Sequence, residues 1–346
     1  MNVLVTGAAG LVGGEVCARL VAAGHRVTAL IHRTTDIRAN DGSPVAVARS
    51  ISGDVSQLRF GWSEDEFGRL ARQTDLVLHC AATVRFDLAE ADYAAVNVTG
   101  TANALAFAEA GGAQFLHVST AYVCGTRDGT ICETDPLPRD GFANGYEASK
   151  AAGERLVRAS SASWAIVRPS IVVGASRDGA IRQFDTTYAA FKLIAEGRVT
   201  AMPSRAGATL DFVPIDHVAG GLVFLAERMA AASGGTYHLV SGQPIRVEDF
   251  AATIGAYPQF HQPALLPPDG FDPSSLPPLE RRLFRRIAGL YASYFQRNPH
   301  FDTSRWRALG GAACPVTGVS YVRRLIDFCI AQGFLPDASG VQRISG

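Results

Sequence analysis

Short apolar runs alternate with stretches of helical periodicity through the first half of the chain. Residues 3–5 form an apolar run, and residues 11–23 then carry apolar side chains at the three- and four-residue spacing of a helix. Further strands are predicted at 27–31, 44–48, 76–78, 115–118, 165–167 and 237–240, and further helices at 63–71, 91–109, 146–159, 184–195 and 215–230. This alternation predicts an α/β fold, a doubly wound parallel sheet with helices on both faces. Covered faces also explain why the strands are apolar runs rather than alternating ones.

The alternation weakens after about residue 174. Residues 257–278 are rich in proline and poor in periodic pattern, and two more helices are predicted near 279–297 and 316–332. We therefore predict a sheet domain formed by 1–174 plus about 212–240. A smaller, discontinuous and mainly helical domain, formed by about 175–211 plus 241–346, would bind the substrate.

Composition narrows the classes of function. The 32 basic and 32 acidic residues among 346 cancel, whereas a nucleic-acid-binding protein normally carries a basic excess. No apolar run approaches the ~20 residues that span a bilayer, and no basic leader opens the chain. The six cysteines and eight histidines show no disulfide or metal-site spacing. We expect a cytoplasmic protein with no membrane span, no nucleic-acid partner and no metal.

A glycine-rich turn joins the first predicted strand to the first predicted helix. Gly7 permits a tight turn, Gly10 lets the backbone approach a pyrophosphate, and Gly13 lets the helix pack closely on the strand. The free N–H groups and the dipole at a helix N-terminus favour such an anion. The position between strand and helix favours a Rossmann dinucleotide site over an ordinary turn. The predicted cofactor contacts here are Gly7, Ala9, Gly10, Leu11, Val12 and Gly13.

The end of the second strand bears on the choice between NAD and NADP. An NAD-dependent protein usually places an acidic residue there, but this chain has none before Asp36. His32 and Arg33 stand there instead, which favours NADPH because arginine binds a 2′-phosphate well, with NADH still possible. An ordinary solvated Arg33 is the alternative. Asp54, next to Val55, is predicted to contact the adenine amine or to serve as a turn aspartate.

One of only two lysines lies four residues after a tyrosine. On a helix, Tyr146 and Lys150 would lie on one face. A cation ~4 Å from the phenol is worth ~4 kcal/mol at an effective dielectric of ~20, so we expect the tyrosine pKa to fall by ~3 units. That shift would make Tyr146 a general acid near neutral pH. Thr120 follows the strand 115–118 and could donate a hydrogen bond to a carbonyl oxygen beside Tyr146.

Seven motifs together resemble the extended short-chain dehydrogenase/reductase superfamily. They are TGAAGLVG (6–13), GDV (53–55), HCAATV (79–84), NVTGT (97–101), STAYVCG (119–125), YEASK (146–150) and RPSIVVG (168–174). The resemblance implies catalytic roles for Thr120, Tyr146 and Lys150, with Asn97 supporting the lysine and its proton-relay water. It also places further residues against the cofactor: Ala81, Ala82, Thr83, Pro169, Ile171 and Val172.

Within that superfamily the chain is most similar to the thioester reductase and fatty acyl reductase branch, which has a male-sterility-like NAD-binding domain. The segments WSEDEF (62–67), NGYEASKAAGE (144–154) and LDFVPIDHVAGGLVFLA (210–226) carry this resemblance. It implies an NAD(P)H-dependent reductase of an acyl thioester, bound to coenzyme A or an acyl-carrier protein, that yields an aldehyde or alcohol. A ketone or enone reductase of a small biosynthetic intermediate is one alternative. A non-catalytic NADP-binding sensor is another, which the complete catalytic set disfavours.

Four arginines gather within the predicted helix 279–297. They are Arg281, Arg282, Arg285 and Arg286. One interpretation is a lid helix with a solvated basic rim. The other is that they meet an anionic handle, either the phosphates of coenzyme A or the acidic face of a carrier protein.

Overall fold

The computed structural model describes residues 1–338 and is built on a seven-stranded sheet. The strands lie in the order β12-β7-β5-β4-β1-β2-β3, and each neighbouring pair is parallel. Their bounds are β1 Asn2–Thr6, β2 Arg26–Ile31, β3 Arg49–Ser52, β4 Leu76–His79, β5 Gln114–Val118, β7 Trp164–Pro169 and β12 Gly235–Leu239. The order reverses between β1 and β4, where a doubly wound sheet opens a crevice at the carboxyl ends of its strands. The predicted fold class is confirmed.

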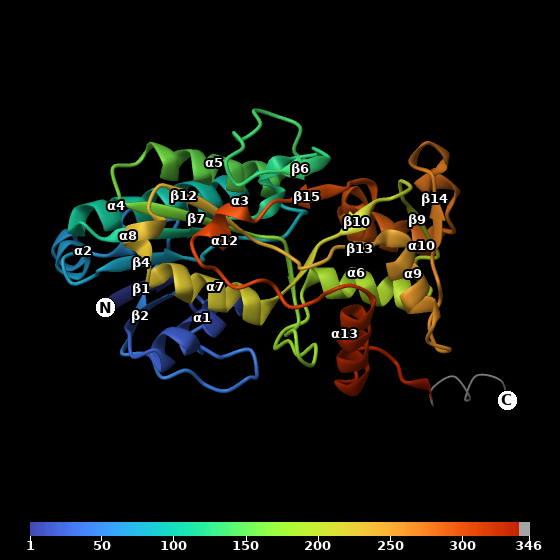
Figure 1. Ribbon diagram of the computed structural model, residues 1–346, viewed down its shortest axis with the longest axis horizontal. Coiled ribbons are helices and arrows are strands. Elements are labelled where there is room, and N and C mark those ends of the chain that lie inside the picture. Colours follow the sequence, from blue (N-terminus) through green and yellow to red (C-terminus); the bar gives the residue numbers. More distant parts are fainter. Residues whose placement is uncertain (339–346) are drawn as a thin grey trace.

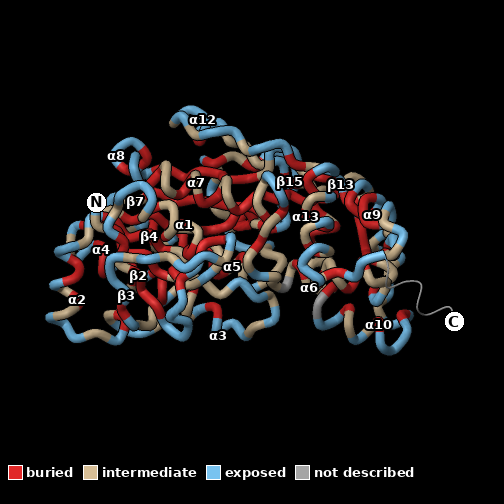
Figure 2. The backbone as a smooth tube through the Cα atoms, turned by 90° about the horizontal axis from the view of Figure 1, so that it is seen from below, coloured by how far each residue is buried: buried red, intermediate tan, exposed pale blue. Residues whose placement is uncertain are grey.

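Helices cover both faces of this sheet (Figure 1). One face packs on α1 (Leu11–Ala22) and α7 (Ile215–Ala226), and the other on α2 (Glu64–Ala71), α4 (Gly100–Gly111) and α5 (Gly145–Ala159). Alternate residues of β4 serve the two faces, since Leu76 and Leu78 join one hydrophobic cluster and Val77 the other. Figure 2 shows buried backbone concentrated in these strands.

Two predicted elements of this region are wrong in detail. The third strand is β3 (Arg49–Ser52), not 44–48, because the ladder with β2 pairs Thr28 with Arg49. In this edge strand only Ile51 is buried, so apolar character does not mark it. The helix predicted at 91–109 comprises α3 (Glu90–Tyr93), a π-helical segment (Ala94–Thr99) and α4, so its register shifts by a wide turn.

The later segments form a separate hydrophobic cluster beside the carboxyl ends of the strands (Figure 1). Short strands pair there as β8–β11, β9–β14 and β10–β13. The strand bounds are β8 Ile171–Val173, β9 Ala201–Pro203, β10 Thr209–Leu210, β11 Phe212–Pro214, β13 Ile245–Arg246 and β14 Ala264–Leu266; the helices are α6 Thr186–Ala195, α9 Val247–Gly255 and α13 Val319–Ala331. Among residues 1–338, no helix combines the length and apolar character needed to cross a membrane.

The run 278–296 is not the single α-helix that periodicity predicts. It consists of α10 (Pro278–Leu283), a π-helical segment (Phe284–Ala288), α11 (Gly289–Tyr291) and a 3-10 turn (Ala292–Gln296). The predicted helix 215–230 likewise ends at Ala226, and α8 (Met229–Ala232) follows it. Elsewhere, β6 (Gly129–Ile131) pairs with β15 (Pro299–Phe301), and α12 covers Ser304–Ala308.

Candidate active site

The glycine turn between β1 and α1 has the geometry of an anion cradle. Gly7 has a φ of +68°, and a Cβ there would lie 2.7 Å from the Ala81 nitrogen. A Cβ on Gly13 would lie 2.2 Å from the Gly7 oxygen. Gly10 is the N-cap of α1 and has no side chain that could accept hydrogen bonds from the first backbone N–H groups of the helix. Those N–H groups are therefore available to a phosphate. The turn therefore fits the pyrophosphate of a dinucleotide.

One cavity of about 360 Å³ connects this turn to Tyr146 and Lys150. Twelve of the residues predicted from the sequence line it: Gly7, Gly10, Leu11, Val12, Gly13, Ala82, Thr120, Tyr146, Lys150, Pro169, Ile171 and Val172. Ala9, Ala81 and Thr83 belong to the same loops but do not line the cavity. The glycine turn, three strand ends and the start of α5 thus meet at the carboxyl edge of the sheet.

The residues predicted for the adenosine end gather beyond β2 and β3. The His32 Nδ1 lies 3.7 Å from the Asp54 Oδ2, and His32 and Arg33 are exposed. Burial opposes the charged form of Asp54, but hydrogen bonds from Ser56 and the charges of His32 and Arg33 outweigh it and lower the pKa. Both the backbone N–H and the hydroxyl of Ser56 donate to Asp54 Oδ1, as in a turn aspartate. Val55 accepts a hydrogen bond from Asn103 through its carbonyl.

Thr120, Tyr146 and Lys150 converge where β5 meets α5. The Asn144 side chain caps α5 by accepting from the Glu147 N–H at 2.9 Å, which begins the helix one turn before the lysine. Tyr146 is hydrogen-bonded to the Thr120 hydroxyl. The Lys150 Nζ donates to the Val118 carbonyl at 2.7 Å, and the residue is 1% exposed. The Thr120 hydroxyl also donates to the Pro169 carbonyl at 3.4 Å. Two hydroxyls and a buried ammonium therefore share one wall of the cavity.

The expected fall in the tyrosine pKa is wrong for this structure. Burial raises the pKa of Tyr146 to about 12, although the hydrogen bond with Thr120 opposes part of that rise. Burial also lowers the pKa of Lys150 to about 8. Sequence spacing gives the separation of two side chains but not the desolvation of either, and here desolvation is the larger effect. Tyr146 consequently stays protonated at neutral pH, as a proton donor must.

Asn97 lies in the π-helical segment and has other partners than Lys150. Its Oδ1 accepts from the Thr83 N–H at 2.8 Å, and its Nδ2 donates to the Thr83 carbonyl and to the Ser149 Oγ. Asn97 thus ties the loop after β4 to the residue that precedes Lys150. Within residues 1–338, no group of three His, Cys, Asp or Glu side chains is placed to hold a metal ion.

Two features of the site were not predicted from the sequence. The first is a contact of the Arg182 Nη2, which donates to the Gly10 carbonyl at 3.1 Å and so places a guanidinium beside the glycine turn. The partners are 172 residues apart, so no local pattern could have found the contact.

The second feature is an aromatic wall that faces Tyr146. Phe86 lies 5.6 Å from the Tyr146 ring and 5.1 Å from the Tyr291 ring, measured between centroids. Tyr291 and Tyr294 both line the cavity, although they belong to the later segments. The Arg297 guanidinium covers the Tyr294 ring at 4.5 Å and donates to the Glu147 Oε1 at 2.9 Å. A buried ion pair thus joins the later segments to the first turn of α5.

Residues 5–222 match the NAD-binding family described as Male sterility protein. The chain belongs to this family. An aldehyde reductase of Aspergillus flavus is 25% identical over 312 residues, which cover 80% of this chain and 30% of that protein. Fatty acyl-CoA reductase 2 of Homo sapiens is 29% identical over 234 residues, 56% of this chain and 44% of the relative. The chain therefore spans less than half the length of these two relatives.

A solved structure covers nearly the whole chain. The terminal R domain from the myxalamid PKS-NRPS biosynthetic pathway superposes with a TM-score of 0.83 at 27% identity, covering 97% of this chain and 92% of that one. These comparisons confirm the predicted superfamily branch and the nicotinamide cofactor. The fold of that R domain is thus shared by nearly the whole of this chain.

Proposed function

We propose that this chain reduces the carbonyl of an acyl thioester to an aldehyde or alcohol at Tyr146. One observation carries the proposal: a single cavity joins the anion-ready N-terminus of α1 to the Tyr146 hydroxyl. The names of the relatives support it, because they describe an aldehyde reductase, a fatty acyl-CoA reductase and a terminal R domain of a carrier-dependent pathway. NADPH, when bound, supplies the hydride.

The residues of the cavity bind the cofactor and the substrate and supply the proton. The turn Gly7–Gly13 holds the pyrophosphate and Arg182 adds positive charge beside it, while Lys150 holds the ribose. Tyr146 and Thr120 donate hydrogen bonds to the carbonyl oxygen as negative charge develops there, and Tyr146 then gives up its proton. The hemithioacetal that results collapses to aldehyde and thiol. Asn97 positions Lys150 through Ser149.

The charges beyond β2 favour NADPH over NADH. His32 and Arg33 are exposed, so both can turn toward a 2′-phosphate. The Asp54 carboxylate accepts from Ser56 through Oδ1 and faces His32 through Oδ2. An arginine–phosphate pair is a charge-assisted bond and is absent with NADH.

The later segments, about 175–211 plus 241–346, act as the substrate domain; residues 339–346 of this range lie outside the described residues. Arg282, Arg285 and Arg286 are exposed on the run that also supplies Tyr291 and Tyr294 to the cavity. A basic surface beside the cavity suits the phosphates of coenzyme A or an acidic carrier protein.

The test is NADPH oxidation with acyl-CoAs, acyl-carrier conjugates and ketones, with released thiol measured in parallel. Thioester reduction requires one thiol per aldehyde formed. The ketone or enone reductase alternative predicts oxidation of NADPH without any thiol. NADPH binding without oxidation across the whole panel would favour the sensor alternative.

A further inference from the structure

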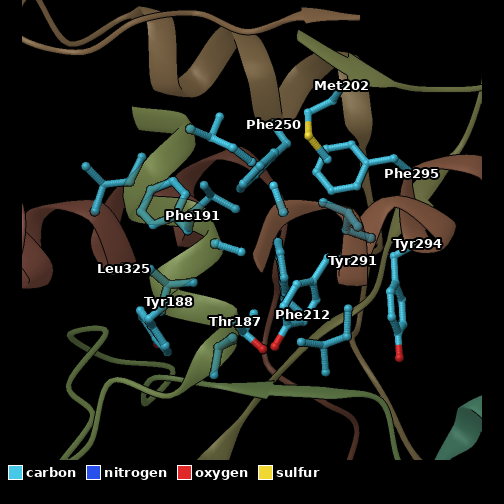
Figure 3. A pocket seen from close by; sticks show the side chains of 18 residues that line it. Thr187, Tyr188, Phe191, Met202, Phe212, Phe250, Tyr291, Tyr294, Phe295 and Leu325 are labelled. Atoms are coloured by element: carbon cyan, nitrogen blue, oxygen red, sulfur yellow. The ribbon is translucent and has the colours of Figure 1, made fainter. Parts of the chain in front are cut away.

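A second, narrower pocket adjoins the active-site cavity inside the later segments. It has a volume of about 70 Å³ and is lined from α6, α9, α13, the short strands and the run 284–296 (Figure 3). Four residues line both spaces: Ile171, Thr187, Tyr291 and Tyr294. The pocket therefore shares a wall with the cavity that holds Tyr146.

The lining of this pocket changes from polar to apolar along its length. At one end the side chains of Thr187 and Tyr291, both shared with the active-site cavity, point toward one another (Figure 3). The opposite end is lined by Met202, Phe250 and Phe295, which are at most 6% exposed. None of the described residues that line the pocket carries a charge.

The hydroxyl of Tyr188, which lines this pocket but not the active-site cavity, is already engaged. Its phenol oxygen accepts a hydrogen bond from the Gly174 N–H at 2.9 Å. A polar or charged ligand group would lose its water at the end lined by Met202, Phe250 and Phe295 without gaining a partner, and that loss is costly. An aliphatic group loses nothing comparable there.

We propose that this pocket holds the unbranched aliphatic end of the acyl group whose carbonyl lies at Tyr146. The proposal rests on thioester reduction as the function of the site and adds the class of acyl group. The pocket is small, at about 70 Å³, so it accommodates only a short aliphatic segment without rearrangement. The preferred substrate is thus an unbranched acyl chain just long enough to fill this pocket from Tyr146, and chains with a charged end are excluded.

The first experiment measures kcat/KM for a series of acyl-pantetheine thioesters from acetyl to dodecanoyl. Each methylene that enters the pocket should raise kcat/KM about fourfold, and the rise should stop once the pocket is full, before the dodecanoyl thioester. A substrate of the preferred length with a terminal carboxylate should fall by at least a hundredfold. A flat series, or equal use of the carboxylate substrate, overturns the proposal.

The second experiment uses a matched pair on α6. Ala190 lines the pocket and is 5% exposed, whereas the adjacent Ala189 does not line it. Ala190→Leu should lower the ratio of kcat/KM between the preferred substrate and acetyl-pantetheine at least tenfold, and Ala189→Leu should leave that ratio unchanged. Equal ratios in the two variants overturn the proposal. Should Ala190→Leu fail to fold, Phe191→Leu enlarges the pocket and should move the optimum to longer chains.

A binding measurement separates this proposal from the proposed function. S-alkyl-pantetheine thioethers cannot be reduced, so calorimetry reports their affinity without turnover. Affinity should rise with alkyl length over the same range of chain lengths as kcat/KM and should be weaker in Ala190→Leu than in Ala189→Leu. If no thioester is reduced although this pattern holds, the proposed function fails alone. If acyl thioesters are reduced and the pattern is absent, only the pocket assignment fails.

Discussion

The sheet region and the later segments contribute to one cavity in different ways. In the sheet region, parallel strands in fixed register carry Thr120, Pro169 and the glycine turn to a common edge. In the later segments, the helices α6, α9 and α13 surround the apolar pocket together with two- and three-residue strands and π and 3-10 turns. A regular sheet thus places the groups proposed for carbonyl reduction, and packed helices joined by short irregular segments shape the space proposed for the acyl chain.

The two regions meet at the ion pair between Glu147 and Arg297. Glu147 is fully buried at the start of α5, next to Tyr146, and Arg297 is 4% exposed. The Arg297 guanidinium also donates to the Gly125 carbonyl at 3.1 Å. The ion pair links the aromatic wall to the helix that carries Tyr146.

The largest expected effect tests whether the chemistry belongs to the sheet region. Tyr146→Phe removes the proton donor, so kcat should fall about 10²- to 10⁴-fold. The dissociation constant of NADPH should change little, because the turn and Lys150 hold the cofactor. Turnover within a few-fold of the unmodified chain would show that another group donates the proton.

Breaking the contact between the regions should cost stability. Glu147→Gln leaves the Arg297 charge buried without its partner, and we expect a loss of about 3–5 kcal/mol in the free energy of unfolding. Chemical denaturation measures it. Glu64→Gln, which breaks an exposed pair with Arg59, should cost at most about 1 kcal/mol. Equal losses in the two variants would contradict the role assigned to the buried pair.

A change at the far end of the sheet region should affect the cofactor alone. Arg33→Ala should weaken NADPH binding by about ten- to a hundredfold, since a charge-assisted bond is worth about 1.5–3 kcal/mol, and should leave NADH almost unaffected. Titration of both cofactors measures the difference. An equal effect on the two, or none, would mean that Arg33 is an ordinary loop residue.

The dependence of kcat/KM on pH tests the role of the Lys150 ammonium. Its pKa of about 8 means that the ammonium is present below that pH and is lost above it. We expect kcat/KM to fall by about tenfold per pH unit above pH 8, while Tyr146 stays protonated throughout that range. A guanidinium does not lose its proton in this range, so Lys150→Arg should abolish the descending limb at a reduced overall rate. A limb that persists in the variant would assign the titration to another group.

The smallest effect concerns the surface of the later segments. Arg281→Glu combined with Arg285→Glu should raise KM several-fold for a coenzyme A or carrier-bound substrate and hardly at all for a truncated thioester without phosphates. Added salt should weaken use of the full substrate by the unmodified chain, because exposed charges are screened over about 8–10 Å. Equal changes in KM for both substrates would mean that the run 278–296 serves only as a lid over the cavity.

The predictions made from the sequence are confirmed where a local pattern is compatible with only one local backbone geometry. A glycine turn between an apolar strand and a helix, and a tyrosine four residues before a lysine, each dictate local geometry. The predictions failed at β3, where only Ile51 of the edge strand is buried, and in the run 278–296, where a π-helical segment packed against α6 interrupts the helix. The pKa direction of Tyr146 was wrong because spacing carries no information on burial.

By itself, the sequence determined the class of fold, the order of its repeating units and the residues that line the active-site cavity from the sheet, because these follow from periodicity and from motifs a few residues long. Only the tertiary structure decided which distant segments complete the site. Arg182 reaches Gly10 across 172 residues, and Arg297 reaches Glu147 across 150. The apolar pocket likewise exists only once α6, α9 and α13 pack together. Contacts of this kind depend on the packing of whole elements, and no short stretch of sequence encodes them.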